Sequence, residues 1–385
     1  MLERRTALAI IPLAVLALAA RVTGSRGSET LLALDRGAAA AAEGQPPALV
    51  PGRAGRAPRA GFGIQYWGEG YTAAALAKAP HAALIIEASV MGADAGERER
   101  MFAAAEVARI RRNGARPVYA YLNVGELEPN RDYWVEAFGS EPDPGAPGEA
   151  SPAWYAGRSP SGERVAAFWT PEWTAVLERR IDALLARGYD GVFLDDVLHY
   201  YTWSMPGVAV PARLAAREGA PKRAGDFAAA MITLVLRLAA YAREGAALHD
   251  RDFAVIVNGG AFIGWDAATE GDAAPTAQHR DFETYLGAID GIAIESALGE
   301  PAQQGTVDAL RHGFGAHGIP VLAIDYLSRH PGADPAGFRA EIAERARSVG
   351  FLPYVADDER FARLDPPLMP PGQASPAIDL AGAPR

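Results

Sequence analysis

The sequence predicts a single (β/α)8 barrel, and three observations lead to that fold class. Across residues 61–364, short apolar runs with β-strand character alternate with helical patterns, which is typical of parallel β-α-β units. There are eight such runs, more than an open doubly wound sheet usually has. The segment after the first run carries no G-x-G-x-x-G turn of the kind that binds dinucleotides in open sheets. A closed barrel is therefore favoured.

The eight predicted strands are continuously apolar, as expected of strands buried on both faces. In chain order they cover residues 61–66, 82–87, 116–123, 191–195, 253–258, 291–295, 320–325 and 350–355.

The helices between these strands have recognisable ends. Thr170, Pro171 and Glu172 supply an N-cap, a first-turn proline and an acid near the positive end of the helix dipole. Gly188 is predicted to end that helix, and another is predicted to begin at Asp226. Apolar residues at helical spacing mark the buried faces: Trp173, Val176, Leu177, Ile181, Leu184 and Leu185 in the first helix, Phe227, Met231, Val235 and Leu238 in the second, and Phe338, Ile342 and Ala346 before the last strand.

The segments outside the predicted barrel, residues 60–364, have a different composition. Arg4 and Arg5 precede an uncharged apolar run over residues 7–20, which predicts a signal peptide or membrane anchor over residues 1–20. Residues 21–59 are rich in Ala, Gly, Arg and Pro and predict a flexible linker, and residues 365–385 predict a Pro-rich tail. We therefore expect a secreted or cell-envelope protein whose membrane contact is limited to its N-terminal segment.

Charge and cysteine content exclude several function classes. The 385 residues include 37 Lys and Arg against 47 Asp and Glu, a formal net charge of −10. This balance argues against a nucleic-acid partner and suits a cationic substrate, although acidity can also serve solubility alone. The absence of cysteine excludes disulfides, thiolate metal sites and a cysteine nucleophile.

Polar side chains end seven of the eight predicted strands. They are Gln65, Glu87, Asn123, Asp195, Asn258, Glu295 and Asp325. In (β/α)8 barrels the chemistry lies at this end of the strands, although Asp and Asn also begin loops and cap helices.

Two strands repeat one pattern of an Asp-Gly pair, three apolar residues and an acid. It runs from Asp190 to Asp195 on the fourth strand and from Asp290 to Glu295 on the sixth. The equal offset predicts that both terminal acids face one cleft from either side of the fifth strand, and the leading Asp-Gly is interpreted as a turn. Two facing carboxylates are the minimum equipment for glycoside hydrolysis, in which one donates a proton and the other attacks the sugar carbon or activates water. Asp196 adds a third acid beside Asp195.

Tryptophans fall mainly in the predicted loops at the same end of the barrel. Those in loops are Trp67, Trp134, Trp154, Trp169, Trp203 and Trp265. Such rings pack well against sugars, and they also close loop cores, so both roles stay open. The long segment over residues 124–169 is expected to form one wall of the cleft, and Tyr200 part of another.

Several motifs together are similar to family 114 glycoside hydrolases. They are Tyr121-Leu122-Asn123-Val124-Gly125-Glu126, Asp190-Gly191-Val192-Phe193-Leu194-Asp195-Asp196-Val197, Val257-Asn258 and Ile294-Glu295-Ser296. That family comprises the endo-α-1,4-polygalactosaminidases and their uncharacterised bacterial and archaeal relatives.

The resemblance implies a (β/α)8 barrel acting on partly deacetylated, and therefore cationic, α-1,4-linked galactosamine polymers. It assigns Asp195 as the nucleophile of a retaining mechanism and Glu295 as the acid/base, with Glu126 and Asn258 in sugar binding. We expect no cofactor and no metal. The remaining substrate-binding candidates are Gln65, Tyr66, Trp67, Glu87, Asn123, Asp196, Tyr200 and Asp325.

Two other functions are compatible with the sequence. A metal-dependent hydrolase could draw its ligands from Asp195, Asp196, His199 and Glu295, although no pair of histidines has H-x-H or H-E-x-x-H spacing. A non-catalytic carbohydrate-binding barrel would account for the aromatic residues and would bind polysaccharide without turnover.

Overall fold

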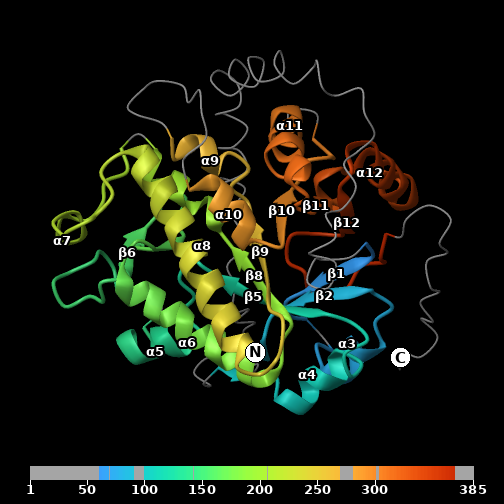
Figure 1. Cartoon of the computed structure of the whole chain (residues 1–385), viewed down its shortest axis with the longest axis horizontal. Coiled ribbons are helices and arrows are strands. Elements are labelled where there is room, and N and C mark those ends of the chain that lie inside the picture. The colour runs from blue at the N-terminus through green and yellow to red at the C-terminus, as the bar shows by residue number, and fades with distance from the viewer. Residues whose placement is uncertain are drawn as a thin grey trace, which may run out of the picture.

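The computed structural model describes residues 60–68, 70–90, 99–141, 143–205, 207–268, 281–300 and 303–368. Eight parallel strands form a nearly closed barrel with helices between them, which confirms the predicted fold class (Figure 1). All eight predicted runs are strands, with ends within two residues of those expected. They are β1 (Phe62–Gln65), β2 (Ala83–Ile86), β5 (Val118–Asn123), β8 (Gly191–Asp195), β9 (Ala254–Asn258), β10 (Gly291–Glu295), β11 (Val321–Tyr326) and β12 (Leu352–Ala356).

The strands follow one another around the sheet in chain order, from β1 to β12. The two edge strands meet through side-chain and loop contacts. The hydroxyl of Tyr354 on β12 donates to the carbonyl of Ile64 on β1 at 3.3 Å. The backbone nitrogen of Tyr66 donates to the carbonyl of Phe361 at 2.9 Å. These contacts bring the loops after the first and last strands together.

The helices lie outside the strands. The α-helices are α3 (Ala73–Lys78), α4 (Ala104–Ile110), α5 (Asp132–Phe138), α6 (Pro171–Arg187), α7 (Ala212–Ala215), α8 (Ala224–Ala247), α9 (Ile263–Asp266), α10 (Phe282–Ala288), α11 (Gln304–Gly313) and α12 (Pro335–Val349). The 3-10 helices are η2 (Val197–Ser204), η4 (Gly315–His317) and η5 (Leu327–Arg329). α6 has the predicted ends, with Thr170 capping the nitrogen of Trp173 and Gly188 in the left-handed conformation at φ 86°. α8 begins two residues before Asp226, whose carboxylate accepts the nitrogen of Arg223 at 3.0 Å from within the first turn.

Two small hairpins extend the loops above the barrel. β3 (Ser89–Val90) pairs with β4 (Arg100–Met101), and β6 (Tyr155–Arg158) pairs with β7 (Arg164–Ala166). The second hairpin and α5 both belong to the long segment after β5, which is therefore folded and not an extended loop.

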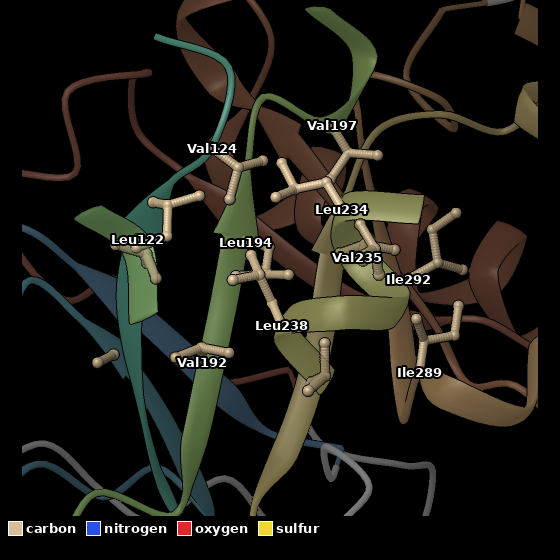
Figure 2. Packing of buried hydrophobic residues seen from close by; sticks show 14 of the residues in the cluster. Leu122, Val124, Val192, Leu194, Val197, Leu234, Val235, Leu238, Ile289 and Ile292 are labelled. Atoms are coloured by element: carbon tan, nitrogen blue, oxygen red, sulfur yellow. The ribbon is translucent and has the colours of Figure 1, made fainter. Parts of the chain in front are cut away.

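Side chains of each barrel strand alternate between an interior layer and an outer layer beneath the helices. Figure 2 shows the outer layer, in which Leu122 of β5 and Val192 and Leu194 of β8 lie against Leu234, Val235 and Leu238 of α8. The interior layer holds the alternate residues, including Tyr119, Phe193, Ile256, Ala293 and Ile324. A polar residue at the end of a strand can therefore face the barrel mouth, the opening at the C-terminal ends of the strands, only if it lies an even number of positions from an interior residue of that strand.

The two Asp-Gly pairs do more than the turns predicted for them. The Asp190 carboxylate accepts the backbone nitrogen of Val118 on the neighbouring strand at 2.9 Å and pairs with Arg111. Asp290 accepts the nitrogen of Val255 at 2.9 Å and pairs with Arg243 at 2.8 Å. Each aspartate therefore fastens the start of its strand to the preceding strand.

The predicted signal or anchor, residues 1–20, and the linker, residues 21–59, lie outside the described residues. Asp365, the first residue of the predicted tail, is buried and bound to the barrel. Its carboxylate accepts the nitrogen of Asp357 at 2.9 Å, and its carbonyl lies 2.8 Å from Nε2 of His81. Among the described residues, one helix, α8, is long and apolar enough to cross a membrane; half of that stretch is buried in the fold.

Candidate active site

Three neighbouring strands supply the centre of the site. Asp195 ends β8, Asn258 ends β9 and Glu295 ends β10. Phe193 and Ala293 are interior residues, so Asp195 and Glu295, two positions further along each strand, also face inward. The repeated six-residue pattern therefore does bring its two acids to one place.

Asn258 connects the two acids. Its side-chain nitrogen donates to Oδ1 of Asp195 and to Oε1 of Glu295, each at 2.8 Å. Two bonds of this length to one atom hold the two acceptor oxygens no more than about 5.6 Å apart, twice the bond length. An amide nitrogen carries two hydrogens, so both are used here.

Each acid also has a tyrosine partner. The hydroxyl of Tyr326 donates to Oε2 of Glu295 at 2.5 Å. Tyr121 hydrogen-bonds the Asp195 carboxylate, and its hydroxyl in turn accepts Nδ2 of Asn123 at 3.1 Å. A continuous hydrogen-bonded chain therefore runs from Tyr121 through both acids to Tyr326.

Neither tyrosine is among the site residues predicted from the sequence, although strand alternation identifies both. It selected the last acid of β11, Asp325, whereas Ile324 and Tyr326 are the interior residues there. Tyr121 likewise lies two positions beyond the interior Tyr119 on β5. Counting alternate residues from the interior layer locates both side chains.

Burial and the nearby Glu295 charge raise the pKa of Asp195 to about 6, although the Asn258 and Tyr121 hydrogen bonds oppose the rise. Asp195 is 3% exposed. Burial, together with the charges of Asp195 and Glu126, raises the pKa of Asp196 well above its usual range. Both aspartates thus keep their protons to higher pH than exposed aspartates do.

A second polar group adjoins Asp195. Asn123 accepts the backbone nitrogens of Gly125 at 3.0 Å and Glu126 at 2.6 Å, and it donates to Oδ2 of Asp196 at 2.5 Å. Nε2 of His199 lies 2.9 Å from Oε1 of Glu126, and 3.8 Å from Oδ1 of Asp196. This brings the loop after β5 against the start of η2.

Close packing maintains this contact. A Cβ atom on Gly125 would lie 2.5 Å from the carbonyl of Asp196 and 2.6 Å from Cβ of His199, so only glycine fits. Asp196 itself adopts a left-handed backbone with φ 60°, and Ser296, directly after Glu295, does the same with φ 54°. Such conformations are uncommon for residues other than glycine and turn the chain sharply after each acid.

Glu126, Asp196 and His199 could together hold a cation, because one ligand atom from each lies within 4.8 Å of the others. Two of the four ligands considered from the sequence, Asp196 and His199, belong to this group. The other two, Asp195 and Glu295, are joined through Asn258 instead.

The loop after β1 contributes the rim of the site. Tyr66 faces inward, with ring centroids 4.6 Å from Tyr121 and 5.0 Å from Phe361. Burial and the charges of Asp195 and Glu295 raise the pKa of Tyr66 well above its usual range. Trp67 is half-buried, and its indole nitrogen donates to the carbonyl of Arg360 at 2.7 Å.

Four predicted substrate-binding side chains are engaged elsewhere, and the first of these is Gln65. It lies between the interior residues Ile64 and Tyr66 and therefore points to the outer layer. Its side-chain nitrogen donates to the carbonyls of Trp67 at 3.1 Å and Ala362 at 3.2 Å. Gln65 thus joins the loop after β1 to the loop after β12.

Glu87 is held in a buried ion network. Arg131, itself 2% exposed, donates to both of its carboxylate oxygens, at 3.0 and 2.6 Å. Arg131 also pairs with Glu99 and Glu128, and Arg180 of α6 pairs with Glu99. The network joins the loops after β2 and β5 and leaves no oxygen of Glu87 without an arginine partner.

Tyr200 and Asp325 are buried outside the barrel mouth. The hydroxyl of Tyr200 donates to Oδ2 of Asp266 at 2.6 Å, and Tyr200 is 1% exposed. Asp325 points to the outer layer, where Oδ1 accepts the nitrogen of Gly299 at 2.7 Å and so fixes the loop after β10. Both residues support the site without facing it.

Six of the seven tryptophans pack against other aromatic rings outside the interior layer of the barrel. Trp134, Trp154 and Trp173 pack with Tyr133 and Phe138. Trp169 and Trp203 pack with Phe227, and Trp265 packs with Phe282. Trp67 differs from these six in lying on the rim, beside the inward-facing Tyr66.

The family model of glycoside-hydrolase family GH114 matches residues 47–365. The chain belongs to this family. Glycoside hydrolysis needs two facing carboxylates, and Asp195 and Glu295 meet that requirement. The match also extends the family region to Asp365, which the structure binds to the barrel.

Relatives of this GH114 chain occur in distant prokaryotes. An uncharacterised protein of Deinococcus radiodurans is 28% identical over 62% of the chain and 63% of its own length, and one of Thermotoga maritima is 27% identical over 71% and 73%. The chain thus spans less than two thirds of the length of the Deinococcus protein. Among solved structures, Aspergillus fumigatus Ega3 in complex with galactosamine shares the fold, with a TM-score of 0.50 and 15% identity over 80% of this chain and 95% of Ega3.

Proposed function

We propose that this protein is an exported, retaining glycoside hydrolase that cleaves an α-1,4-linked galactosamine-containing polysaccharide. Asp195 is the nucleophile and Glu295 the acid/base. The observation that carries the proposal is the sharing of one Asn258 nitrogen by both carboxylates. A single donor holds the two carboxylates close together across the barrel mouth.

The carboxyl separation favours retention. Retaining enzymes have carboxyl groups about 5 to 5.5 Å apart, whereas inverting enzymes need about 6.5 to 9.5 Å to admit water between them. The bonds through Asn258 limit Oδ1 of Asp195 and Oε1 of Glu295 to about 5.6 Å or less. This spacing suits direct attack by Asp195 on the sugar carbon.

The reaction then takes two steps. Asp195 attacks the anomeric carbon, while Glu295 passes a proton to the departing glycosidic oxygen. In the second step Glu295 removes a proton from water, whose oxygen attacks the same carbon and displaces Asp195. Hydrogen bonds from Asn258 and Tyr121 stabilise the Asp195 carboxylate as it departs.

The charge of the site supports a cationic substrate. Among the described residues, no lysine or arginine forms an ion pair with Asp195, Asp196 or Glu295. Two other buried carboxylates do have such partners, since Glu87 pairs with Arg131 and Asp290 with Arg243. A sugar carrying a free ammonium group supplies the missing charge, and galactosamine, the ligand in the Ega3 complex, is such a sugar.

We assign substrate binding to the side chains nearest the acids. Asp196 and Glu126 are the acids available to an ammonium group, and Asn123 orients both. Tyr66 and Trp67 offer aromatic surface at the rim. Export is supported by the charged and apolar pattern of residues 1–20 and is tested by N-terminal sequencing of protein recovered outside the cytoplasm.

Product analysis on the full chain tests the proposal. Partly deacetylated α-1,4-galactosaminan is expected to yield galactosamine oligomers, with none from Glu295→Gln. Proton NMR during the reaction is expected to detect the α anomer first, because retention preserves the linkage configuration. A β anomer formed first would require an inverting mechanism. Cleavage of chitosan alone would refute the substrate assignment, and binding without any cleavage would favour a carbohydrate-binding protein.

The grouping of Glu126, Asp196 and His199 favours one second candidate, a metal-dependent hydrolase. It predicts that a chelator abolishes polysaccharide cleavage and that one added divalent ion restores it. Under the two-carboxylate mechanism, dialysis against a chelator leaves the rate unchanged.

A further inference from the structure

Glu295 accepts a hydrogen bond at each of its two oxygens, from two donors of different kinds. Oε1 receives Nδ2 of Asn258 at 2.8 Å, and Oε2 receives the hydroxyl of Tyr326 at 2.5 Å. A general acid must nevertheless carry a proton on one of these oxygens. We propose that this proton resides on Oε2, and that Tyr326 is the positioning residue that allows Glu295 to alternate between its protonated and ionised forms.

The proposal rests on the acid/base role given to Glu295 above. Its first step concerns Oε1. An amide nitrogen has hydrogens and no acceptor lone pair, so Asn258 can face only an oxygen that accepts. The same nitrogen also donates to Asp195, which holds its orientation. Protonation of Oε1 would set two donors against each other, so Oε1 stays an acceptor throughout the cycle.

The second step concerns Oε2. A tyrosine hydroxyl can donate or accept by rotation about its C–O bond. With Glu295 ionised, the hydroxyl donates to Oε2; with Oε2 protonated, the hydroxyl turns and accepts. Only Oε2 has a partner that tolerates both states.

Tyr326 is held in place for this role. It is 1% exposed on β11, with its ring centroid 5.8 Å from that of Phe361 and 5.3 Å from the guanidinium carbon of Arg329. Burial and the charge of Glu295 raise its pKa well above the usual range, so its hydroxyl keeps its hydrogen through the reaction. Because the ring is fixed and the hydroxyl hydrogen can rotate, Tyr326 can donate to Oε2 or accept from it without moving.

The proton balance follows. In the first step the proton on Oε2 leaves its hydrogen bond to the Tyr326 oxygen and passes to the glycosidic oxygen. The sugar carbon bonds to Asp195 as its bond to the glycosidic oxygen breaks, and the Tyr326 hydroxyl rotates to donate to the new carboxylate. In the second step Oε2 takes a proton from water, the water oxygen bonds to the sugar carbon, and the bond to Asp195 breaks. The hydroxyl then returns to its accepting orientation.

Tyr326→Phe removes the adaptable partner, and Tyr354→Phe is its matched control. Tyr354 lies in the same interior layer on the next strand, but its hydroxyl meets only backbone groups, the carbonyl of Ile64 and the nitrogen of Asp365. Both variants lose one oxygen from the barrel interior, so a purely structural effect would appear in both.

The direct measurement is a carbon-13 NMR titration of the full chain with labelled glutamate carboxyls, in which Glu295→Gln identifies the signal. Without the Tyr326 donor, the ionised form loses a charge-assisted bond, so the titration midpoint of Glu295 is expected to rise by about one to two pH units. Tyr354→Phe is expected to leave it unchanged. An unchanged midpoint in Tyr326→Phe would overturn the proposal. 3-Fluorotyrosine at position 326, a stronger donor of nearly the same shape, is expected to lower the midpoint and serves if Tyr326→Phe does not fold.

Kinetics on galactosaminan give a second readout. The basic limb of kcat/KM in Tyr326→Phe is expected to move upward with the midpoint, and kcat to fall about tenfold or more with little change in KM, because Glu295 becomes a weaker acid in the first step. A fall in kcat with an unmoved basic limb would also overturn the proposal. A raised midpoint in an enzyme that cleaves another polymer but not galactosaminan would instead support the proton assignment and refute the substrate assignment alone.

Discussion

Asp195 and Glu295 are joined by one atom, Nδ2 of Asn258, which donates a 2.8 Å hydrogen bond to each carboxylate. Two acids so close repel one another when both are ionised. The shared amide offsets part of that repulsion and fixes the distance across which a sugar carbon must fit. Much of the behaviour expected of the enzyme depends on this arrangement.

Asn258→Ala is expected to lower kcat by two to three orders of magnitude. Each hydrogen bond to a charged group contributes about 1.5 to 3 kcal/mol, and about 1.4 kcal/mol corresponds to a factor of ten in rate. Steady-state kinetics with a circular dichroism control for folding measure the effect. A decrease of less than tenfold would mean that the two tyrosines hold the acids without the amide.

Asp195→Asn and Glu295→Gln are each expected to abolish turnover in a folded protein, because each removes a group that bonds with or protonates the substrate. Asp325→Asn is the comparison, since Asp325 fixes the loop after β10 through Gly299 and is expected to lower activity far less. Activity assays with thermal melts separate the two kinds of effect. Equal loss at Asp325 and Asp195 would show that the wrong pair was chosen.

The acidic limb of kcat/KM is expected near pH 6. Burial and the charge of Glu295 raise the pKa of Asp195 from about 3.8 to about 6, so the nucleophile is protonated, and inactive, below that pH. Activity should fall tenfold per pH unit below the break. A pH profile of kcat/KM at constant ionic strength measures it, and a break near pH 4 would place Asp195 in a more hydrated setting.

Asp266→Asn is expected to stabilise the protein at neutral pH. Burial raises the pKa of Asp266 to about 6, so between about pH 4 and pH 6 the folded state holds a proton that the unfolded state releases, and stability falls as pH rises through this window. The two-unit shift corresponds to roughly 3 kcal/mol. Asparagine still accepts the Tyr200 hydroxyl and does not ionise.

Thermal melts at pH 4 and pH 7.5 test this expectation. The Tm of Asp266→Asn should match the parent at pH 4 and exceed it at pH 7.5. Asp182→Asn is the matched control, because Asp182 accepts the Tyr241 hydroxyl at an exposed position. A similar gain in both variants would exclude burial as the cause.

The fold was predictable because each barrel strand corresponds to a separate apolar run in the sequence. The pair of acids was predictable because the same pattern precedes Asp195 and Glu295. Predictions failed where the last polar residue of a strand was taken as facing the mouth. On β11 that choice gave Asp325, whereas alternation places Tyr326 inside.

Other errors arose from contacts between segments far apart in the sequence. Glu87 is bound by Arg131, which lies 44 residues further along the chain. Tyr200 is bound to Asp266, 66 residues away. Tryptophans have the same surface chemistry whether they meet a sugar or another ring, so composition alone could not assign Trp134 or Trp203 to loop cores.

Asp190 and Asp290 are each bound to the neighbouring strand. This fixes the number of residues that β8 and β10 can place between the bound aspartate and the acid at the strand end. From each anchored aspartate to its acid there are five peptide steps, and the direction of the side chain reverses at every step. Insertion or deletion of one residue between them would turn Asp195 or Glu295 from the barrel mouth into the layer beneath the helices. These two stretches can therefore change their apolar residues but not their number.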